Sequence, residues 1–125
     1  MGAQAEGRRA ERQAASHLRG HGLKLIASNY RSRFGEVDLI MSDGGVIVFV
    51  EVKRRRSARF MNPAESVDVH KQRRLAMAAG RFLATHPRYG RQPARFDVVT
   101  ITGPNYRPQF DWIRDAFQLD DSAGY

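Results

Sequence analysis

A glutamate and a lysine interrupt an apolar run near the middle of the chain. The run Val46–Lys53 reads VIVFVEVK, so Glu51 and Lys53 lie two residues apart and share one face if the run is a strand. Burying a charge without a partner carries a large free-energy cost, and these two charged groups would face the same layer. We therefore expect this end of the strand to have charged partners or to open into a cleft.

The residues just before this run predict one such partner. The sequence Asp-Gly-Gly at 43–45 is typical of a tight turn, which would join Phe34–Met41 and Val46–Lys53 as an antiparallel hairpin. If the two glycines form the loop, Asp38 directly opposes Glu51 on the same face of the sheet. A different loop length would shift the register, and an odd shift would place the two carboxylates on opposite faces.

Two facing carboxylates repel each other unless a cation lies between them. A hard divalent ion with oxygen ligands is the natural solution, so Mg²⁺ (or Mn²⁺) is the expected cofactor, held by Asp38 and Glu51. Lys53 would lie beside the ion, where it can orient or help to deprotonate a water, or offset charge on a phosphate. The competing interpretation is a structural ladder of ion pairs, in which Glu36 pairs with Lys53 and Glu51 pairs with an arginine.

The order of these groups resembles a nuclease motif. Asp38 followed by Glu51-Val52-Lys53 is similar to the PD-(D/E)xK motif of nucleases. Three stretches also resemble the YraN-like family of small bacterial proteins, and the resemblance covers about Gly7 to Phe117; they are Gly35–Ile40 (GEVDLI), Val48–Lys53 (VFVEVK) and Arg95–Val99 (RFDVV). That family is similar in fold to archaeal Holliday junction resolvases.

The resemblance implies a restriction-endonuclease-like core and a role for individual residues. It implies that Asp38 and Glu51 are metal ligands, that the Val52 carbonyl is a further ligand and that Lys53 is the catalytic lysine. The chain departs from the pattern in two places. A valine precedes Asp38 where the motif's name has proline, and Arg59–Pro63 replaces the Phe-Gly-x-Pro-like turn expected after the lysine strand.

Glu11 is a further candidate, contributed by the first predicted helix. It lies three, four and seven residues before the small-residue stripe that should pack on the sheet, which is Ala14, Ala15 and Leu18. A carboxylate there could reach the metal ligands, as a matching Glu does in resolvase-like nucleases. The alternative is a glutamate at the rim that pairs with Arg8 or Arg12 on the surface.

The charge of the chain indicates the class of partner. The formal net charge is +8 and the isoelectric point is about 10.8. Because each phosphate that a basic side chain neutralises releases counterions, nucleic acid is the leading candidate. The nuclease resemblance favours DNA over RNA. The side chains expected to contact it are Arg33, Arg54, Arg55, Lys71 and Arg74. For Lys71 the alternative is a lysine whose stem covers apolar surface.

The hydrophobic patterns predict an α/β fold with a mixed sheet flanked by helices, in the order α-β-β-β-α-β-β. Helices are expected at about Ala5–Arg19 and Val69–Thr85, with a helix start at Asn62-Pro63 between them. Strands are expected at Leu23–Tyr30, Phe34–Met41, Val46–Lys53, Arg95–Thr102 and Gln109–Ile113, followed by a short turn with Ala116 and Phe117. In the second strand we expect Val37, Leu39 and Met41 on one face and Glu36, Asp38 and Ile40 on the other. Residues 1–119 are expected to form a single domain, and 120–125 a loose tail.

Composition excludes several classes of protein. The chain has no cysteine, which excludes disulfide frameworks and cysteine-based zinc sites. No apolar run approaches the roughly 18 residues of a membrane span, and the first residues lack the apolar core of a signal peptide. We therefore expect a cytoplasmic protein without a membrane partner.

These observations favour a metal-dependent endonuclease that hydrolyses phosphodiester bonds in DNA, with branched structures such as Holliday junctions among its substrates. Cutting a junction symmetrically requires two sites, and thus a homodimer. The alternative is a non-catalytic nucleic-acid-binding protein that keeps the nuclease fold. A third interpretation is a protein-interaction scaffold in which the acidic and lysine side chains are structural.

Overall fold

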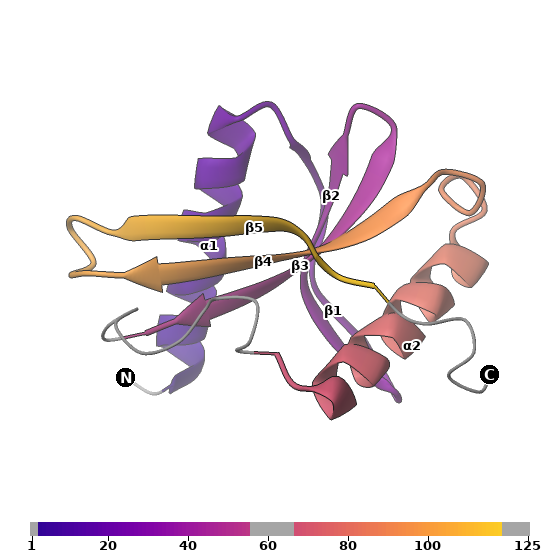
Figure 1. The fold of residues 1–125 in the computed structure, drawn as a ribbon, viewed down its shortest axis with the longest axis horizontal. Helices are drawn as coiled ribbons and strands as arrows, with labels where there is room; N and C mark the ends of the chain where they lie inside the picture. The colour runs from indigo at the N-terminus through magenta and orange to yellow at the C-terminus, as the bar shows by residue number, and fades with distance from the viewer. Residues whose placement is uncertain (1–2, 56–66, 119–125) are drawn as a thin grey trace.

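Helices and strands follow one another in the order that the sequence predicts. The computed structural model describes residues 3–55 and 67–118. Its elements are α1 (Ala3–Gly20), β1 (Lys24–Ser32), β2 (Gly35–Asp43), β3 (Val46–Arg54), α2 (Val69–Thr85), β4 (Ala94–Thr102) and β5 (Gln109–Phe117). The predicted α/β fold class, a mixed sheet flanked by helices as in a restriction-endonuclease-like core, is confirmed (Figure 1). The division into a domain at 1–119 and a tail at 120–125 stays a prediction.

The five strands form one sheet in the order β1-β2-β3-β4-β5. β1, β2 and β3 are antiparallel neighbours, whereas β4 runs parallel to β3 and pairs antiparallel with β5. Parallel neighbours need a long crossover connection, and α2 lies in that connection. The sheet is strongly twisted, so that β1 and β2 run across the direction of β4 and β5 in Figure 1.

Each face of the sheet has its own hydrophobic core, because β3 is apolar on both faces. α1 covers one face, and the buried residues there are Ala10, Ala14, Ala15, Leu18, Leu23, Leu39, Met41, Val48, Val50, Val99 and Ile101. α2 covers the other face, and the buried residues there are Val37, Ile40, Ile47, Phe49, Val67, Leu75, Ala78, Ala79, Phe82 and Val98. The two-sided burial predicted for the third strand is confirmed.

Local chemistry sets the start of α2. Asp68 precedes the helix, and its side chain accepts a hydrogen bond from the backbone N–H of Lys71 at 2.8 Å. The helix therefore begins at Val69, as predicted. The helix start predicted at Asn62-Pro63 and the departure at Arg59–Pro63 lie outside the described residues. Neither described helix combines the length and the apolar character needed to cross a membrane.

The predicted end of the last strand is wrong. β5 continues to Phe117, which pairs with Phe96, so Ala116 and Phe117 belong to the strand and not to a terminal turn. The register shifts beside Phe96, and Asp115 has a positive φ of 50°. This bulge lets β5 continue to Phe117, although the polar residues around Asp115 interrupt the alternation of apolar and polar residues in the sequence.

The predicted face of Val37 is also wrong. Val37 lies in the core under α2 together with Ile40, whereas Leu39 belongs to the core under α1. Strict alternation requires continuous pairing, and the described pairing of β2 with β3 stops at Leu39. The change of face therefore falls at Asp38, which lies between Val37 and Leu39 in the sequence.

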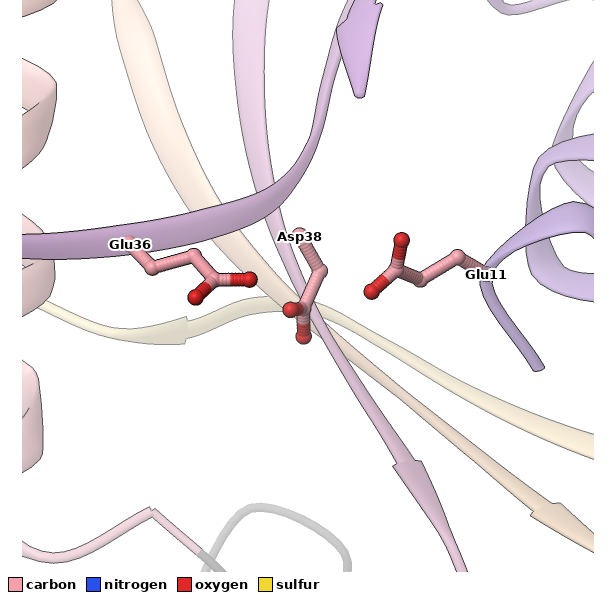
Figure 2. Close-up of side chains that lie close together, drawn as sticks. All are labelled: Glu11, Glu36 and Asp38. Carbon is pink, nitrogen blue, oxygen red and sulfur yellow. The ribbon is translucent and has the colours of Figure 1, made fainter. Parts of the chain in front are cut away.

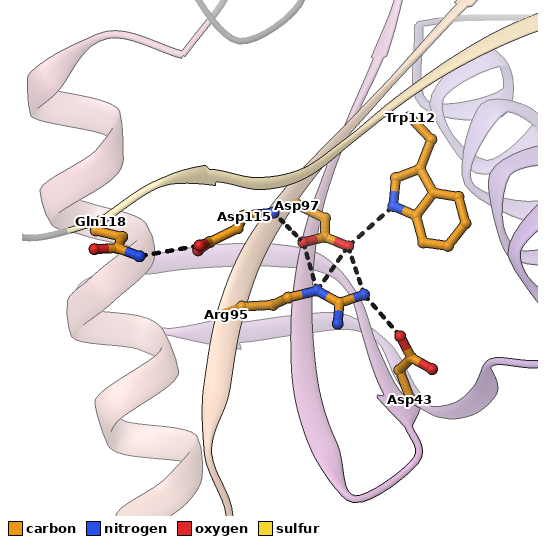
Figure 3. Close-up of polar contacts among 6 residues, drawn as sticks. All are labelled: Asp43, Arg95, Asp97, Trp112, Asp115 and Gln118. Atoms are coloured by element: carbon orange, nitrogen blue, oxygen red, sulfur yellow. Dashed lines mark hydrogen bonds and ion pairs between the residues drawn. The ribbon is translucent and has the colours of Figure 1, made fainter.

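A buried aspartate connects β4 and β5 with the turn between β2 and β3 (Figure 3). Asp97 is fully buried, and it accepts hydrogen bonds from Arg95 Nε at 3.0 Å, Trp112 Nε1 at 2.9 Å and the backbone N–H of Asp115 at 2.9 Å. Arg95 also contacts Asp43 at 2.9 Å. The Asp97 carboxylate thus satisfies donors from β4 and β5, and Arg95, which it binds, also contacts Asp43 beside the turn.

We expect Asp97→Ala to lower the free energy of unfolding by about 3–5 kcal/mol, because it leaves a half-buried guanidinium and an indole N–H without their partner. Urea unfolding measures the change. Asp111→Ala, an exposed position on the same strand pair, is the control and should change stability by less than about 0.5 kcal/mol. A loss below about 1 kcal/mol for Asp97→Ala would contradict the account.

Candidate metal and nucleic-acid site

The β2–β3 hairpin has the register that the sequence predicts. The two glycines of the turn have φ values of 56° and 92°, as a two-residue loop of this kind requires. Pairing runs from Asp43 opposite Val46 to Leu39 opposite Val50. The next pair in this register would be the two candidate carboxylates, and the described ladder ends just before them.

Asp38 makes a side-chain contact where the backbone pairing stops. Its Oδ2 accepts a hydrogen bond from the backbone N–H of Val52 at 2.8 Å. Glu51, the preceding residue, is only 4% exposed. Asp38 and Glu51 both line the cavities at the point where β2 separates from β3, and the direct pairing of these two residues stays a prediction.

Three carboxylates from two elements converge beside this point (Figure 2). Glu11 from α1, and Glu36 and Asp38 from β2, each offer an oxygen that lies within 4.8 Å of the others; we call this group the acid cluster. Figure 2 shows Asp38 between the two glutamates, with Glu11 reaching in from the helix. Of the two alternatives for Glu11, the structure supports the one that brings it to the site.

Glu36 is a site residue that the sequence reasoning missed. The competing ladder interpretation pairs it with Lys53, whereas its ion pair in the structure is with Arg31 of β1, at 3.8 Å on the surface. The signal that could have found it is its spacing, because it lies two residues before Asp38. Side chains at that spacing share a face of a regular strand.

Glu51 is held by lysines and not by the arginine that the ladder interpretation requires. Lys71 Nζ lies 2.7 Å from Glu51 Oε1, and Lys53 Nζ lies 3.9 Å from the same oxygen. Both lysine side chains are about one-third exposed. Lys71 therefore extends from the first turn of α2 into the centre of the site, and it does not serve only to cover apolar surface.

Burial and like charges raise the pKa values of Asp38 and Glu11. Burial raises the pKa of Asp38, the charges of Glu51 and Glu11 raise it further, and the Val52 N–H lowers it, with a result of about 7. Burial also raises the pKa of Glu11, while a hydrogen bond from Asn29 lowers it and the charges of Glu36 and Glu51 raise it. Repelling carboxylates with raised pKa values are typical of a site that binds a cation.

The two lysines shift in opposite directions. Burial lowers the pKa of Lys53, and the hydrogen bond and charge of Lys71 lower it further. For Lys71, burial acts to lower the pKa, but the hydrogen bond and charge of Glu51 outweigh it and the pKa is raised. Lys71 is thus the cation that stays protonated, and Lys53 is the amine that more readily gives up its proton.

Two cavities meet at these residues. One has a volume of about 700 Å³ and extends past Glu11 and Lys53 to Arg54 and Arg55. The other has a volume of about 510 Å³ and extends past Glu36 to Arg31 and Arg74. Both are lined by Asp38, Glu51 and Lys71, so together they form one groove with basic side chains at either end, which we call the site groove.

The predicted nucleic-acid contacts do not all lie in this groove. Lys71, Arg55 and Arg74 line it, as does Arg54, whose guanidinium also donates to the carbonyl of Gly103. Arg33 lines a third cavity, at the tip of the β1–β2 hairpin.

The donor set of the acid cluster fits a hard divalent cation. Its ligands are carboxylate oxygens only, and Mg²⁺ and Mn²⁺ prefer such ligands to nitrogen or sulfur. Glu51 lies outside the group of mutually close oxygens and is paired with Lys71. The structure therefore supports a cation site, while the identity of the ion stays a prediction.

Comparison with known proteins gives one family over most of the chain. The family model described as "Uncharacterised protein family UPF0102" matches residues 10–101, a span that includes the acid cluster, Glu51 and both lysines. The chain is 50% identical over 118 residues to a UPF0102 protein of Xanthomonas campestris, covering 94% of this chain and 95% of the relative. It is 48% identical over 115 residues to one of Stutzerimonas stutzeri (92% and 96%), and 43% identical over 114 residues to one of Pseudomonas aeruginosa (90% and 91%).

We expect Asp38→Asn to become more stable relative to the wild type as the pH rises from 4 to 8 in EDTA. Folding raises the pKa of Asp38 from 3.8 to about 7, so the folded state binds more protons than the unfolded state within this window. Raising the pH therefore costs the wild type stability, by roughly 1–3 kcal/mol, and asparagine avoids the loss while keeping an acceptor for Val52. Urea unfolding at several pH values measures the difference in the free energy of unfolding between Asp38→Asn and the wild type. A difference that stays constant or shrinks as the pH rises would contradict this prediction.

We expect Lys71→Met to destabilise the metal-free protein by about 1–3 kcal/mol, because Glu51 stays buried and loses its nearest cation. The double variant Lys71→Met/Glu51→Gln should recover much of this loss, since no uncompensated charge remains. Lys24→Met, an exposed lysine at the start of β1, is the control. Equal stability of Lys71→Met and Lys24→Met would show that the ion pair contributes nothing.

Proposed function

This chain belongs to the UPF0102 family, and we propose that it is a metal-dependent endonuclease that hydrolyses phosphodiester bonds in DNA. The proposal depends on one observation: the acid cluster, buried Glu51 and two lysines lie together in a groove that is basic at both ends. Carboxylates suit a divalent ion, and the basic ends suit the phosphates on either side of the bond to be cut.

Asp38 would hold the ion together with Glu11 and Glu36 of the acid cluster. Glu51 and the Val52 carbonyl are the further ligands that the resemblance implies, and Glu51 would join the ion once Lys71 releases it. When bound, Mg²⁺ or Mn²⁺ supplies Lewis-acid stabilisation of phosphate charge and lowers the pKa of a bound water. The N–H of Val52 fixes the Asp38 carboxylate at 2.8 Å. This bond orients one ligand before any cation arrives.

Lys53 is placed to move a proton in the reaction. Its pKa is lowered by burial and by Lys71, so a larger fraction of the amine is unprotonated than in a free lysine and available to take a proton from a water. Lys71 keeps its proton and offers a fixed positive charge to the phosphate. Arg54, Arg55 and Arg74 neutralise flanking phosphates, which positions the strand without reading its sequence.

The proposal extends to substrate and assembly. Branched DNA, Holliday junctions among them, is the substrate that the resemblance to resolvases implies. Symmetric cutting would require a homodimer with one site in each subunit.

One contact favours a second function. Lys71 neutralises Glu51 at 2.7 Å with no need for a divalent ion. A protein with this pair could bind nucleic acid through its basic groove and never cleave it.

We expect Asp38→Asn, Glu51→Gln and Lys53→Met each to reduce Mg²⁺- or Mn²⁺-dependent cleavage of branched or duplex DNA by about 100-fold or more. Lys24→Met and Asp111→Asn, two exposed positions outside the groove, should leave the rate unchanged. Cleavage is measured on gels with end-labelled DNA.

Folded wild-type protein that cuts no DNA with either metal would sink the endonuclease proposal. In that case, salt-dependent gel shifts that survive the triple substitution Asp38→Asn/Glu51→Gln/Lys53→Met would support the binding-only function.

A further inference from the structure

A third cavity lies at the tip of the β1–β2 hairpin and is not used by the proposed reaction. It has a volume of about 440 Å³ and is lined by Tyr30, Arg31, Ser32, Arg33, Phe34 and Arg81; we call it the tip cavity. A volume of this size falls within the range of sites that take one small ligand.

The tip cavity continues from the site groove. Arg31 and Ser32 line both the tip cavity and the part of the groove that contains Glu36 and Asp38. A DNA strand that leaves the acid cluster on this side therefore passes Arg31 first and then reaches Arg33 and Arg81. Along that route the charge changes from negative at the carboxylates to positive at the arginines.

The hairpin tip is held in place before any ligand binds. The hydroxyl of Ser32 accepts a hydrogen bond from the N–H of Phe34 at 3.1 Å and donates one to the carbonyl of Gly35 at 3.2 Å. Gly35 lies against α2 so closely that a Cβ there would be 3.2 Å from the Cβ and the carbonyl oxygen of Arg74. This close approach fixes the cavity between the tip and the helix, which reduces the ordering that binding would require.

The lining of the tip cavity suits a nucleobase. Phe34 is half-buried and stands outside the two hydrophobic cores that the described residues form. The guanidinium of Arg33 lies 5.0 Å from the centre of the Phe34 ring. An aromatic ring beside arginines is the combination on which unpaired bases stack in single-strand-binding proteins.

We propose that the tip cavity binds an unpaired nucleotide of the DNA strand whose scissile phosphate lies at the acid cluster. The inference rests on the proposed function for the position of the strand. A duplex keeps its base faces stacked inside, so only a single-stranded segment can offer a base to Phe34. The substrate class is then DNA with a single-stranded segment beside the site of cleavage.

The test measures binding in EDTA, where no cleavage occurs, by fluorescence anisotropy of three labelled DNAs. They are a blunt duplex, the same duplex with a single-stranded extension of about six nucleotides, and a copy in which the extension is abasic. We expect the wild type to bind the normal extension about five- to tenfold more tightly than the abasic one, which carries the same phosphates. Phe34→Leu should remove most of this preference, with folding checked by circular dichroism.

Arg88→Gln is the matched control for Arg33→Gln. Arg88 is also exposed and lies 5.5 Å from the centre of an aromatic ring, that of Tyr89, but it does not line the tip cavity or the site groove. Arg33→Gln should weaken binding of the extension more than Arg88→Gln does, since both remove one charge.

Equal affinity for normal and abasic extensions, or an unchanged preference in folded Phe34→Leu, would overturn the proposal. So would a wild-type protein that binds none of the three DNAs. A preference that holds in a protein that does not cleave with metal would support binding of an unpaired base in the tip cavity and reject the proposed reaction.

Discussion

The hydrogen bond from the Val52 N–H to Asp38 is the contact on which the site depends. It replaces backbone pairing at the place where β2 leaves β3, so the two central strands separate there without leaving this donor unsatisfied. The separation opens the sheet to both helices at once. Glu11 enters from α1 and Lys71 enters from α2, which is why one site combines side chains from both layers.

The site is negative within a chain whose net charge is +8. Four carboxylates gather at the separation of the strands, and the two nearby lysines both contact Glu51. The charge of Asp38 does not stabilise the fold, because the pKa of this carboxyl is raised and not lowered. The stability lost at Asp38 must be supplied by the two hydrophobic cores and by the Asp97 network, in which Arg95, Trp112 and the Asp115 N–H all donate to one carboxylate.

Much of this arrangement could be predicted from the sequence, because it depends on local patterns. Two adjacent glycines fix the turn, the turn fixes the register, and the register holds up to Leu39 opposite Val50, one pair before Asp38 and Glu51. The face of Val37 could not be predicted, since alternation assumes pairing that the Asp38 side chain interrupts. The partner of Glu51 could not be predicted either: the rotation of α2 over the sheet decides whether Lys71 points at β3, and a crossover helix can pack in several rotations.

A divalent ion and the Lys71 ammonium both require Glu51 Oε1, so under the proposed function they compete for it. The buried carboxylate needs a positive charge in either case, because an unpaired one would carry a large desolvation cost. Exchange of one cation for the other keeps Glu51 neutralised and releases the ammonium of Lys71 into the groove, beside the position of the phosphate. The same lysine can thus stabilise the fold before the ion binds and stabilise phosphate charge afterwards, which explains why a side chain near the substrate path begins in an ion pair.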